Sequence, residues 1–119
     1  MGLLFFMEPI HFNPKENNSC FGCGGANPFG LKLSFQYDPE SQKIFGEYYP
    51  RKEHCGGENI LHGGIIATIL DEACSKVLSA TNKTGLTKNL NIDFLKPITA
   101  NKKITIHAHC ESLKRHKHF

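Results

Sequence analysis

The stretch His62-Gly-Gly-Ile-Ile-Ala-Thr-Ile-Leu-Asp-Glu-Ala73 decides how the rest of the chain is interpreted. Two glycines open it, and apolar residues then recur at helical spacing: Ile65, Ile66, Ile69, Leu70, Ala73, Val77 and Leu78. Because residues three and four apart share one face of an α-helix, these side chains form a broad apolar face. The pattern predicts one long helix from about Gly64 to Thr81.

Segments on both sides of this helix alternate between apolar and polar residues, as β-strands do. Before it, residues 31–37 and 43–49 predict a hairpin, and a polar, glycine-bearing loop at 51–61 leads into the helix. After it, residues 87–95 and 103–113 alternate again. The order strand, strand, helix, strand, strand predicts an α+β domain in which an antiparallel sheet wraps one central helix.

Length and composition indicate one globular domain, since the chain has 119 residues, 39% of them hydrophobic and 21% charged. Residues 1–19 are expected to form a mobile or loosely docked lead-in, and residues 20–119 the domain itself. The five cysteines are odd in number, and we find no secretory segment. A disulfide scaffold is therefore not expected, and the chain is expected to be cytoplasmic.

Hydropathy argues against a membrane partner, and the net charge gives no indication of a nucleic-acid partner. The apolar opening at residues 1–7 is too short to span a bilayer, so no membrane partner is expected. A net charge of +3 is too small to indicate nucleic acid by itself. Residues 101–119 carry five basic residues against one acidic residue. This stretch either meets an anionic partner or is a solvated strand with a frayed end.

The helical motif resembles the signature of hot-dog-fold acyl-coenzyme A thioesterases, most of all the phenylacetate-pathway type and the carboxyl-terminal modulator protein group. Two other blocks carry the likeness, in the same order: Cys20-Phe-Gly-Cys-Gly with Asn27-Pro-Phe-Gly-Leu-Lys-Leu33, and Thr87-Lys-Asn-Leu-Asn-Ile-Asp-Phe-Leu-Lys-Pro97. The resemblance spans roughly Cys20 to Cys110 and implies a hot-dog fold. The family normally adds a strand beyond Phe119, so it also implies a sheet that lacks the last strand or strands.

Asp71 is the residue most expected to carry the chemistry. A carboxylate beside an apolar helix face is costly to bury unless it has a partner or a role, and the alternative is that it lies on the exposed side. The resemblance implies that Asp71 is a general base or a nucleophile. It would take a proton from water, or attack the thioester carbonyl and form an anhydride. The sequence leaves both routes open.

Gly63 and Gly64 open the helix, where free backbone amides favour negative charge and missing side chains let a ligand approach. A tetrahedral oxyanion needs such donors. The other interpretation is a tight turn that requires glycine for its geometry alone. The resemblance makes the Gly63 amide the first candidate to polarise the thioester oxygen, with Gly64 beside the substrate. It also places His62 in the site, where it fixes the loop or contacts substrate.

Further polar residues complete the expected site. By resemblance, Thr87 reaches the Asp of a partner subunit and orients the attacking water; otherwise it is simply a β-branched strand residue. Glu58 and Asn59 precede the motif and are expected to line the site. The basic residues that are candidates for the phosphates of coenzyme A are Lys96, Lys114, Arg115 and Lys117.

Cys20 and Cys23 form a Cys-x-x-Cys pair, and a zinc site can be drawn by adding His54 and Cys55. The second pair is adjacent in sequence, which is poor spacing for two ligands of one ion, and the chain has no second Cys-x-x-Cys. The proteins that the chain resembles often carry this lead-in without metal. No metal site is therefore expected.

The combined expectation is hydrolysis of an acyl-coenzyme A or acyl-carrier thioester to a free acid and a thiol. No cofactor is expected, since coenzyme A is part of the substrate. The resemblance implies a homodimer or a dimer of dimers, with each site between one subunit's helix and the other's strand. The alternative is a catalytically impaired module that binds acyl thioesters or a protein partner without turnover. A zinc-binding nucleic-acid module and an enoyl-coenzyme A hydratase are weaker alternatives.

Overall fold

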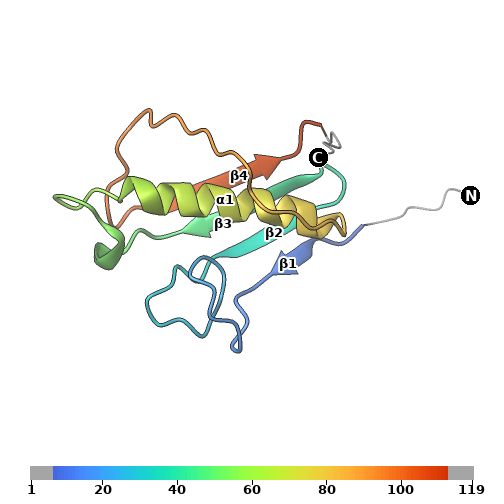
Figure 1. The fold of residues 1–119 in the computed structure, drawn as a ribbon, viewed down its shortest axis with the longest axis horizontal. Helices are drawn as coiled ribbons and strands as arrows, with labels where there is room; N and C mark the ends of the chain where they lie inside the picture. The colour runs from blue at the N-terminus through green and yellow to red at the C-terminus, as the bar shows by residue number, and fades with distance from the viewer. Residues whose placement is uncertain (1–6, 113–119) are drawn as a thin grey trace, which may run out of the picture.

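The computed structural model describes residues 7–112, which form a four-stranded antiparallel sheet with one long helix packed on it (Figure 1). The strands lie in the sheet in chain order. Among the described residues, no helix has both the length and the apolar character needed to cross a membrane. The elements are β1 (Ile10–Phe12), β2 (Ser34–Asp38), β3 (Lys43–Tyr48), the 3-10 helix η1 (Lys52–His54), α1 (Gly63–Ala80) and β4 (Ile104–His109).

One face of the sheet forms the core because its strands alternate between buried and exposed residues. In β2, Phe35 and Tyr37 are buried and their neighbours Ser34 and Gln36 are exposed. Tyr37 pairs in register with Ile44 of β3, which is fully buried. A glycine at residue 46 makes room for the Phe35 ring, because a Cβ there would lie 2.6 Å from it. The inward face is thus apolar across neighbouring strands.

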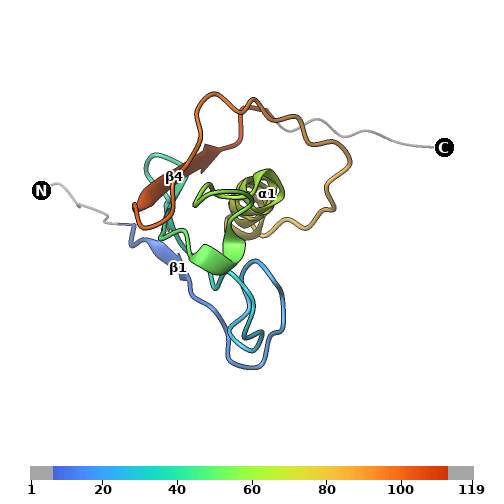
Figure 2. The ribbon, with the colours of Figure 1, turned by 90° about the vertical axis from the view of Figure 1, so that its left-hand side faces the viewer.

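The helix α1 packs on this face through residues one turn apart. Its buried residues are Ile69, Ala73 and Val77, which follow the i, i+4 spacing of a single helix face. The helix contacts β2, β3 and β4. Figure 2 looks along α1 and shows it on one side of the sheet. The predicted helix and the α+β arrangement of one helix on an antiparallel sheet are therefore confirmed.

The first strand was not predicted from the sequence. The pattern indicates a loosely docked lead-in over residues 1–19, but Ile10–Phe12 form β1 and pair with residues 35–37 of β2. Three residues are too few to display a period of two, so β1 carries no sequence signal of its own. The predicted strand at 103–113 is confirmed over the shorter span of β4, and its last residue lies outside the described residues.

The prediction of a strand at residues 87–95 is wrong for this chain, because residues 83–98 contain no strand. The segment runs back along α1 on the side away from the sheet (Figure 2). Its alternating sequence is present, but a strand also needs a hydrogen-bonding neighbour. Successive residues of the segment meet successively earlier residues of the helix: Gly85 lies beside Leu78, Thr87 beside Asp71 and Phe94 beside Gly63.

An apolar groove of about 610 Å³ lies between α1 and β4. β4 is the last strand of the described sheet, so its outer edge has no neighbouring strand there. Within residues 7–112, part of the α1 surface next to β4 is therefore left uncovered by the sheet. The apolar residues that line the groove are Ile66, Ile69, Leu70, Ile98, Ile104 and Ile106.

Candidate active site

The first turn of α1 is built around the side chain of His62. This residue is the N-cap, and its Nδ1 accepts a hydrogen bond from the Gly64 amide at 2.9 Å. Because Nδ1 accepts, the proton of the neutral ring lies on Nε2. A Cβ on Gly64 would lie 3.0 Å from Nδ1, so glycine leaves room for the ring. His62 therefore fixes the start of the helix, and its predicted contact with substrate stays a prediction.

Gly63 presents the free amide of this helix end. Within residues 7–112 its N–H donates to no group, whereas the amides of Ile65 and Ile66 both donate to the His62 carbonyl. A Cβ on Gly63 would have only the Phe94 ring within van der Waals range, at 3.6 Å. An unpaired amide at a helix N-terminus is a good donor for a negatively charged oxygen.

Asp71 lies half-buried near the middle of α1, on the side away from the sheet, and its Oδ1 accepts a hydrogen bond from the exposed Thr87 hydroxyl. The resemblance places Thr87 against the Asp of a partner subunit. In the structure it contacts Asp71 of its own chain, because residues 83–98 fold back along the same helix. Burial, and secondarily the charge of Asp71, raises the pKa of the Cys74 thiol one turn further along.

An open cavity of about 860 Å³ lies beside the start of α1. Phe29 is 78% exposed and offers apolar surface that a ligand can cover. Arg51 adds a cation, and its Nη2 donates to the Gly30 carbonyl at 2.5 Å. Sequence reasoning missed Arg51, since it lies in a polar loop and belongs to no spaced motif. The residues that line the cavity include Phe21, Phe29, Arg51, His54, His62 and Gly64.

The structure does not bring the other predicted residues to this cavity. Glu58 and Asn59 form the tip of a tight turn, with φ values of 43° and 62°. Two successive positive φ values are typical of a type I′ turn, and both side chains are exposed outside the cavity. Lys96 is also exposed and lies outside it. Arg115 lies beyond the described residues, as do Lys114 and Lys117.

The zinc arrangement drawn from the sequence is not formed. His54 is only 5% exposed, its Nδ1 contacts the Tyr48 hydroxyl, and its Nε2 lies 3.2 Å from the Phe29 carbonyl oxygen. Burial raises the pKa of the Tyr48 hydroxyl. The Cys55 thiol contacts a backbone carbonyl instead. Over residues 7–112, the potential metal ligands that do lie together are Cys20, Cys23 and Glu72.

The thioesterase superfamily model matches residues 58–119, which is more than half of the chain and includes α1 with Asp71. The chain belongs to the thioesterase superfamily. This membership confirms the resemblance at the level of the superfamily, and the single helix on an antiparallel sheet is the hot-dog arrangement that the resemblance implied. The Cys20–Leu33 block lies outside the matched residues, so its likeness to the family stays a prediction.

A solved structure shares the fold of this superfamily member. It is the crystal structure of a protein described as a thioesterase superfamily protein, with a TM-score of 0.75 and 18% sequence identity. The match covers 81% of this chain and 47% of the other chain. The chain therefore spans about half the length of that protein. No curated protein matches the chain.

Proposed function

We propose that this thioesterase-superfamily chain hydrolyses an acyl-coenzyme A or acyl-carrier thioester to a free acid and a thiol, in the cytoplasm. The observation that carries the proposal is the half-buried Asp71 carboxylate, held by the Thr87 hydroxyl on a helix whose first amide is unpaired within residues 7–112. Thioester hydrolysis needs a base or nucleophile together with a donor for the oxyanion. In this proposal coenzyme A enters only as part of the substrate.

The chemistry follows from these groups. The Gly63 amide donates to the thioester carbonyl oxygen and stabilises the negative charge that develops on it. Asp71 then either removes a proton from an attacking water or attacks the carbonyl carbon itself. In the second route the thiolate leaves, an anhydride forms, and water cleaves it to the acid. The Thr87 hydroxyl holds the carboxylate in one orientation during either route.

The spacing along α1 favours a site shared by two chains. Gly63 and Asp71 are eight residues apart, which at 1.5 Å per residue is about 12 Å along the helix axis. Reacting atoms must come within about 3–3.5 Å. Direct attack by Asp71 on a carbonyl held by the Gly63 amide of the same chain is therefore out of reach. A two-fold pair of chains solves this, because the amide of one chain then faces the carboxylate of the other.

The segment after α1 supports the same association. Leu86 is 99% exposed and Leu95 is 88% exposed, and Phe94 is exposed as well. Large apolar side chains in this state indicate a surface that a partner covers. We propose that residues 87–95 pair with a second copy in a homodimer or a dimer of dimers. The strand predicted there would then form between chains.

The cavity beside α1 suggests how a thioester enters. Its aromatic side chains suit the acyl or pantetheine part of the substrate, and the Arg51 guanidinium suits a phosphate. Arg51 therefore joins Lys96 and Arg115 as a candidate for the phosphates of coenzyme A. We expect Arg51→Met to raise KM for coenzyme A esters more than it lowers kcat.

Replacement of the carboxylate tests the chemistry. Release of free thiol from a panel of acyl-coenzyme A esters is expected to fall by roughly 10²–10⁴-fold in Asp71→Asn, as for loss of a general base. Glu40→Gln, an exposed carboxylate in the β2–β3 turn, is the matched control and should keep the wild-type rate. An unchanged rate in Asp71→Asn would remove this residue from the mechanism. Ester binding by the wild-type chain without thiol release would favour the non-catalytic alternative.

Mixing two inactive variants tests the shared site. Gly63→Pro removes the amide N–H, and proline is tolerated there because residue 63 opens the helix and His62 has an extended ψ of 135°. Gly63→Ala keeps the N–H and is the control.

An equal mixture of Asp71→Asn and Gly63→Pro chains is expected to recover about a quarter of wild-type activity. Half of the pairs are then mixed, and each mixed pair holds one intact site of two. No recovery after exchange of subunits would place both groups in one chain.

A further inference from the structure

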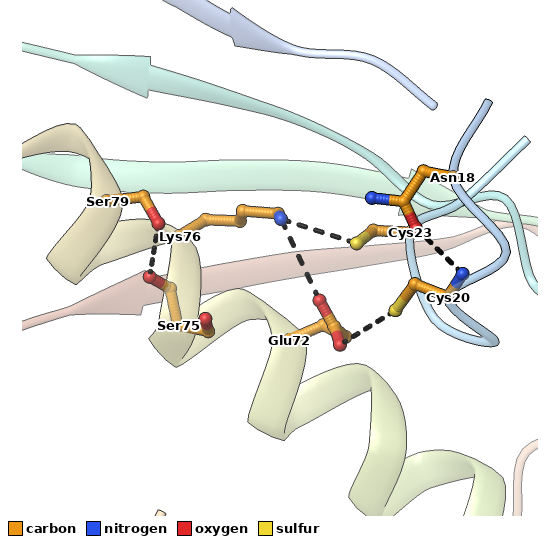
Figure 3. Close-up of polar contacts among 7 residues, drawn as sticks. All are labelled: Asn18, Cys20, Cys23, Glu72, Ser75, Lys76 and Ser79. Atoms are coloured by element: carbon orange, nitrogen blue, oxygen red, sulfur yellow. Dashed lines mark hydrogen bonds and ion pairs between the residues drawn. The ribbon is translucent and has the colours of Figure 1, made fainter. Parts of the chain in front are cut away.

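The Cys20–Cys23 turn packs against the face of α1 that carries Glu72 and Lys76 (Figure 3). The Cys20 Sγ lies 3.7 Å from Glu72 Oε1, and the Lys76 Nζ lies 3.4 Å from Cys23 Sγ. One ligand atom from each of Cys20, Cys23 and Glu72 can be chosen so that all three lie within 4.8 Å of one another. These groups belong to two segments about fifty residues apart in sequence, so the fold itself brings them together.

The turn is shaped to bring these groups together. The Cys20 amide donates to Asn18 Oδ1 at 2.8 Å, and the Gly24 amide donates to the Cys20 carbonyl at 2.9 Å. A Cβ on Gly22 would lie 2.5 Å from the Glu72 Cγ, so residue 22 has no room for a side chain while Glu72 covers the turn. The backbone therefore fixes both thiols on the side that faces the Glu72 carboxylate.

The donor set and its spacing suit a zinc-like ion. With Zn–S bonds of about 2.3 Å and Zn–O bonds of about 2.0–2.2 Å, neighbouring ligands of a tetrahedral site lie roughly 3.5–3.8 Å apart. The distance between Cys20 Sγ and Glu72 Oε1 falls in that range. Thiolates also select zinc over the oxygen-seeking magnesium and calcium ions.

The charges of the cluster balance around a divalent cation. Two thiolates and one carboxylate carry three negative charges, which one divalent ion and the Lys76 ammonium neutralise. The ammonium already lies within hydrogen-bonding distance of Cys23 Sγ, as an outer partner of a metal-bound thiolate would.

We propose that Cys20, Cys23 and Glu72 bind a divalent zinc-class ion, with a water in the fourth position and Lys76 donating to Cys23. Binding displaces one proton from each thiol to solvent. The ion joins the Cys20–Cys23 turn to Glu72 of α1, which is the residue after Asp71. It would therefore hold the turn against the helix. This set differs from the one drawn from the sequence, since Glu72 replaces His54 and Cys55, and it does not depend on the proposed hydrolysis.

Metal titration of the full chain tests the site. After removal of bound metal with a chelator, Zn²⁺ or Co²⁺ is added alone, and binding is followed by calorimetry and by the thiolate-to-cobalt charge-transfer absorption. One ion per chain, that absorption, and a rise in the melting temperature are expected. Cys23→Ser should abolish the absorption and weaken binding by more than the roughly 10–100-fold that loss of an outer partner costs. Cys110→Ser, which removes an exposed thiol just after β4, is the matched control and should bind like the wild type.

Glu72→Gln keeps the size of the side chain but removes its charge. It tests whether Glu72 binds the ion or whether Cys20 and Cys23 bind it without Glu72. We expect it to bind Zn²⁺ at least ~10-fold more weakly than the wild type and to change the cobalt spectrum. Wild-type affinity in Glu72→Gln would overturn the assignment of Glu72 as a ligand. The site as a whole is overturned if the wild-type chain binds no stoichiometric zinc, or if Cys110→Ser loses binding to the same degree as Cys23→Ser.

Discussion

The two sides of α1 differ in how fully other residues of the same chain cover them. The side that faces the sheet buries Ile69, Ala73 and Val77 against β2, β3 and β4. Among residues 7–112, the opposite side is covered by residues 83–98, in which Leu86, Leu90, Phe94 and Leu95 are exposed. One chain therefore supplies its own core, while the side that carries the Asp71–Thr87 contact is left open. Mutations on the sheet-facing side should therefore change the stability of the fold, and mutations on the open side should change the assembly of the site.

The largest expected effect is on the sheet-facing side. Ile44 is fully buried, and Ile44→Ala should lower the free energy of unfolding by about 2–5 kcal/mol, through lost burial and the cavity that remains. Urea denaturation monitored by circular dichroism measures the change. The control is Leu86→Ala, on the open side, which should leave the midpoint nearly unchanged. Equal losses in the two variants would mean that both sides contribute equally to the core.

The next effect is on the open side and on catalysis. Thr87→Val removes the hydroxyl that donates to Asp71. Loss of the donor that holds the carboxylate in one orientation should lower kcat by roughly 10–100-fold, since a small misplacement of reacting groups costs up to about 10²-fold. Because residue 87 is exposed, the stability of the chain should change little. Thr87→Ser keeps a hydroxyl and should retain most of the activity; a rate as low as that of the valine variant would point to packing instead.

A third effect lies at the rim of the core, where the Tyr48 hydroxyl contacts buried His54. Tyr48→Phe leaves that ring nitrogen unpaired and should cost about 1–3 kcal/mol near pH 8. Burial raises the Tyr48 pKa above its ordinary 10.0. Below pH 10 the hydroxyl is therefore protonated in both the folded and the unfolded chain, and its full contribution to folding stability is present. Above it, the unfolded tyrosine ionises first and wild-type stability falls. The gap between wild type and variant should therefore narrow when unfolding is repeated near pH 11; a constant gap would contradict this.

The smallest effect on the single chain is expected at the exposed residues of the open side. Leu95→Ser should change the unfolding free energy of the chain by less than about 0.5 kcal/mol. If residues 87–95 pair with a second copy, the wild-type melting temperature will rise with protein concentration, and the variant will lose part of that dependence. Sedimentation of both proteins across the same concentrations measures the association directly. Identical association in both would exclude Leu95 from the contact surface.

Much of the fold could be predicted because its signals are local. The apolar spacing of α1 and the alternation of β2 and β3 lie within single segments of sequence. The Asp71 and Gly63 predictions came from one contiguous motif. Within residues 7–112, Asp71 accepts a hydrogen bond from a hydroxyl and the Gly63 amide donates to no group, and the catalytic roles of both residues stay predictions.

The rest depended on contacts between distant segments. β1 forms because residues 35–37 offer an edge, and its three residues carry no pattern of their own. Residues 87–95 have the pattern of a strand but form no β-ladder within residues 7–112. The packing of Glu72 on the Cys20–Cys23 turn, and of Arg51 beside the start of α1, could not be inferred from spacing. A sequence pattern reports what a segment favours, and tertiary contact decides what it does.

The sheet register has a consequence for the order in which the molecule folds. β2 and β3 are joined by a short turn, whereas the pairing of Tyr48 with Ile104 encloses the whole helix and the segment after it. Closing a long loop costs more chain entropy than closing a short one. We therefore expect the β2–β3 hairpin and α1 to form the nucleus, with β4 docking afterwards. Substitutions in β4 should then accelerate unfolding and leave the folding rate nearly unchanged.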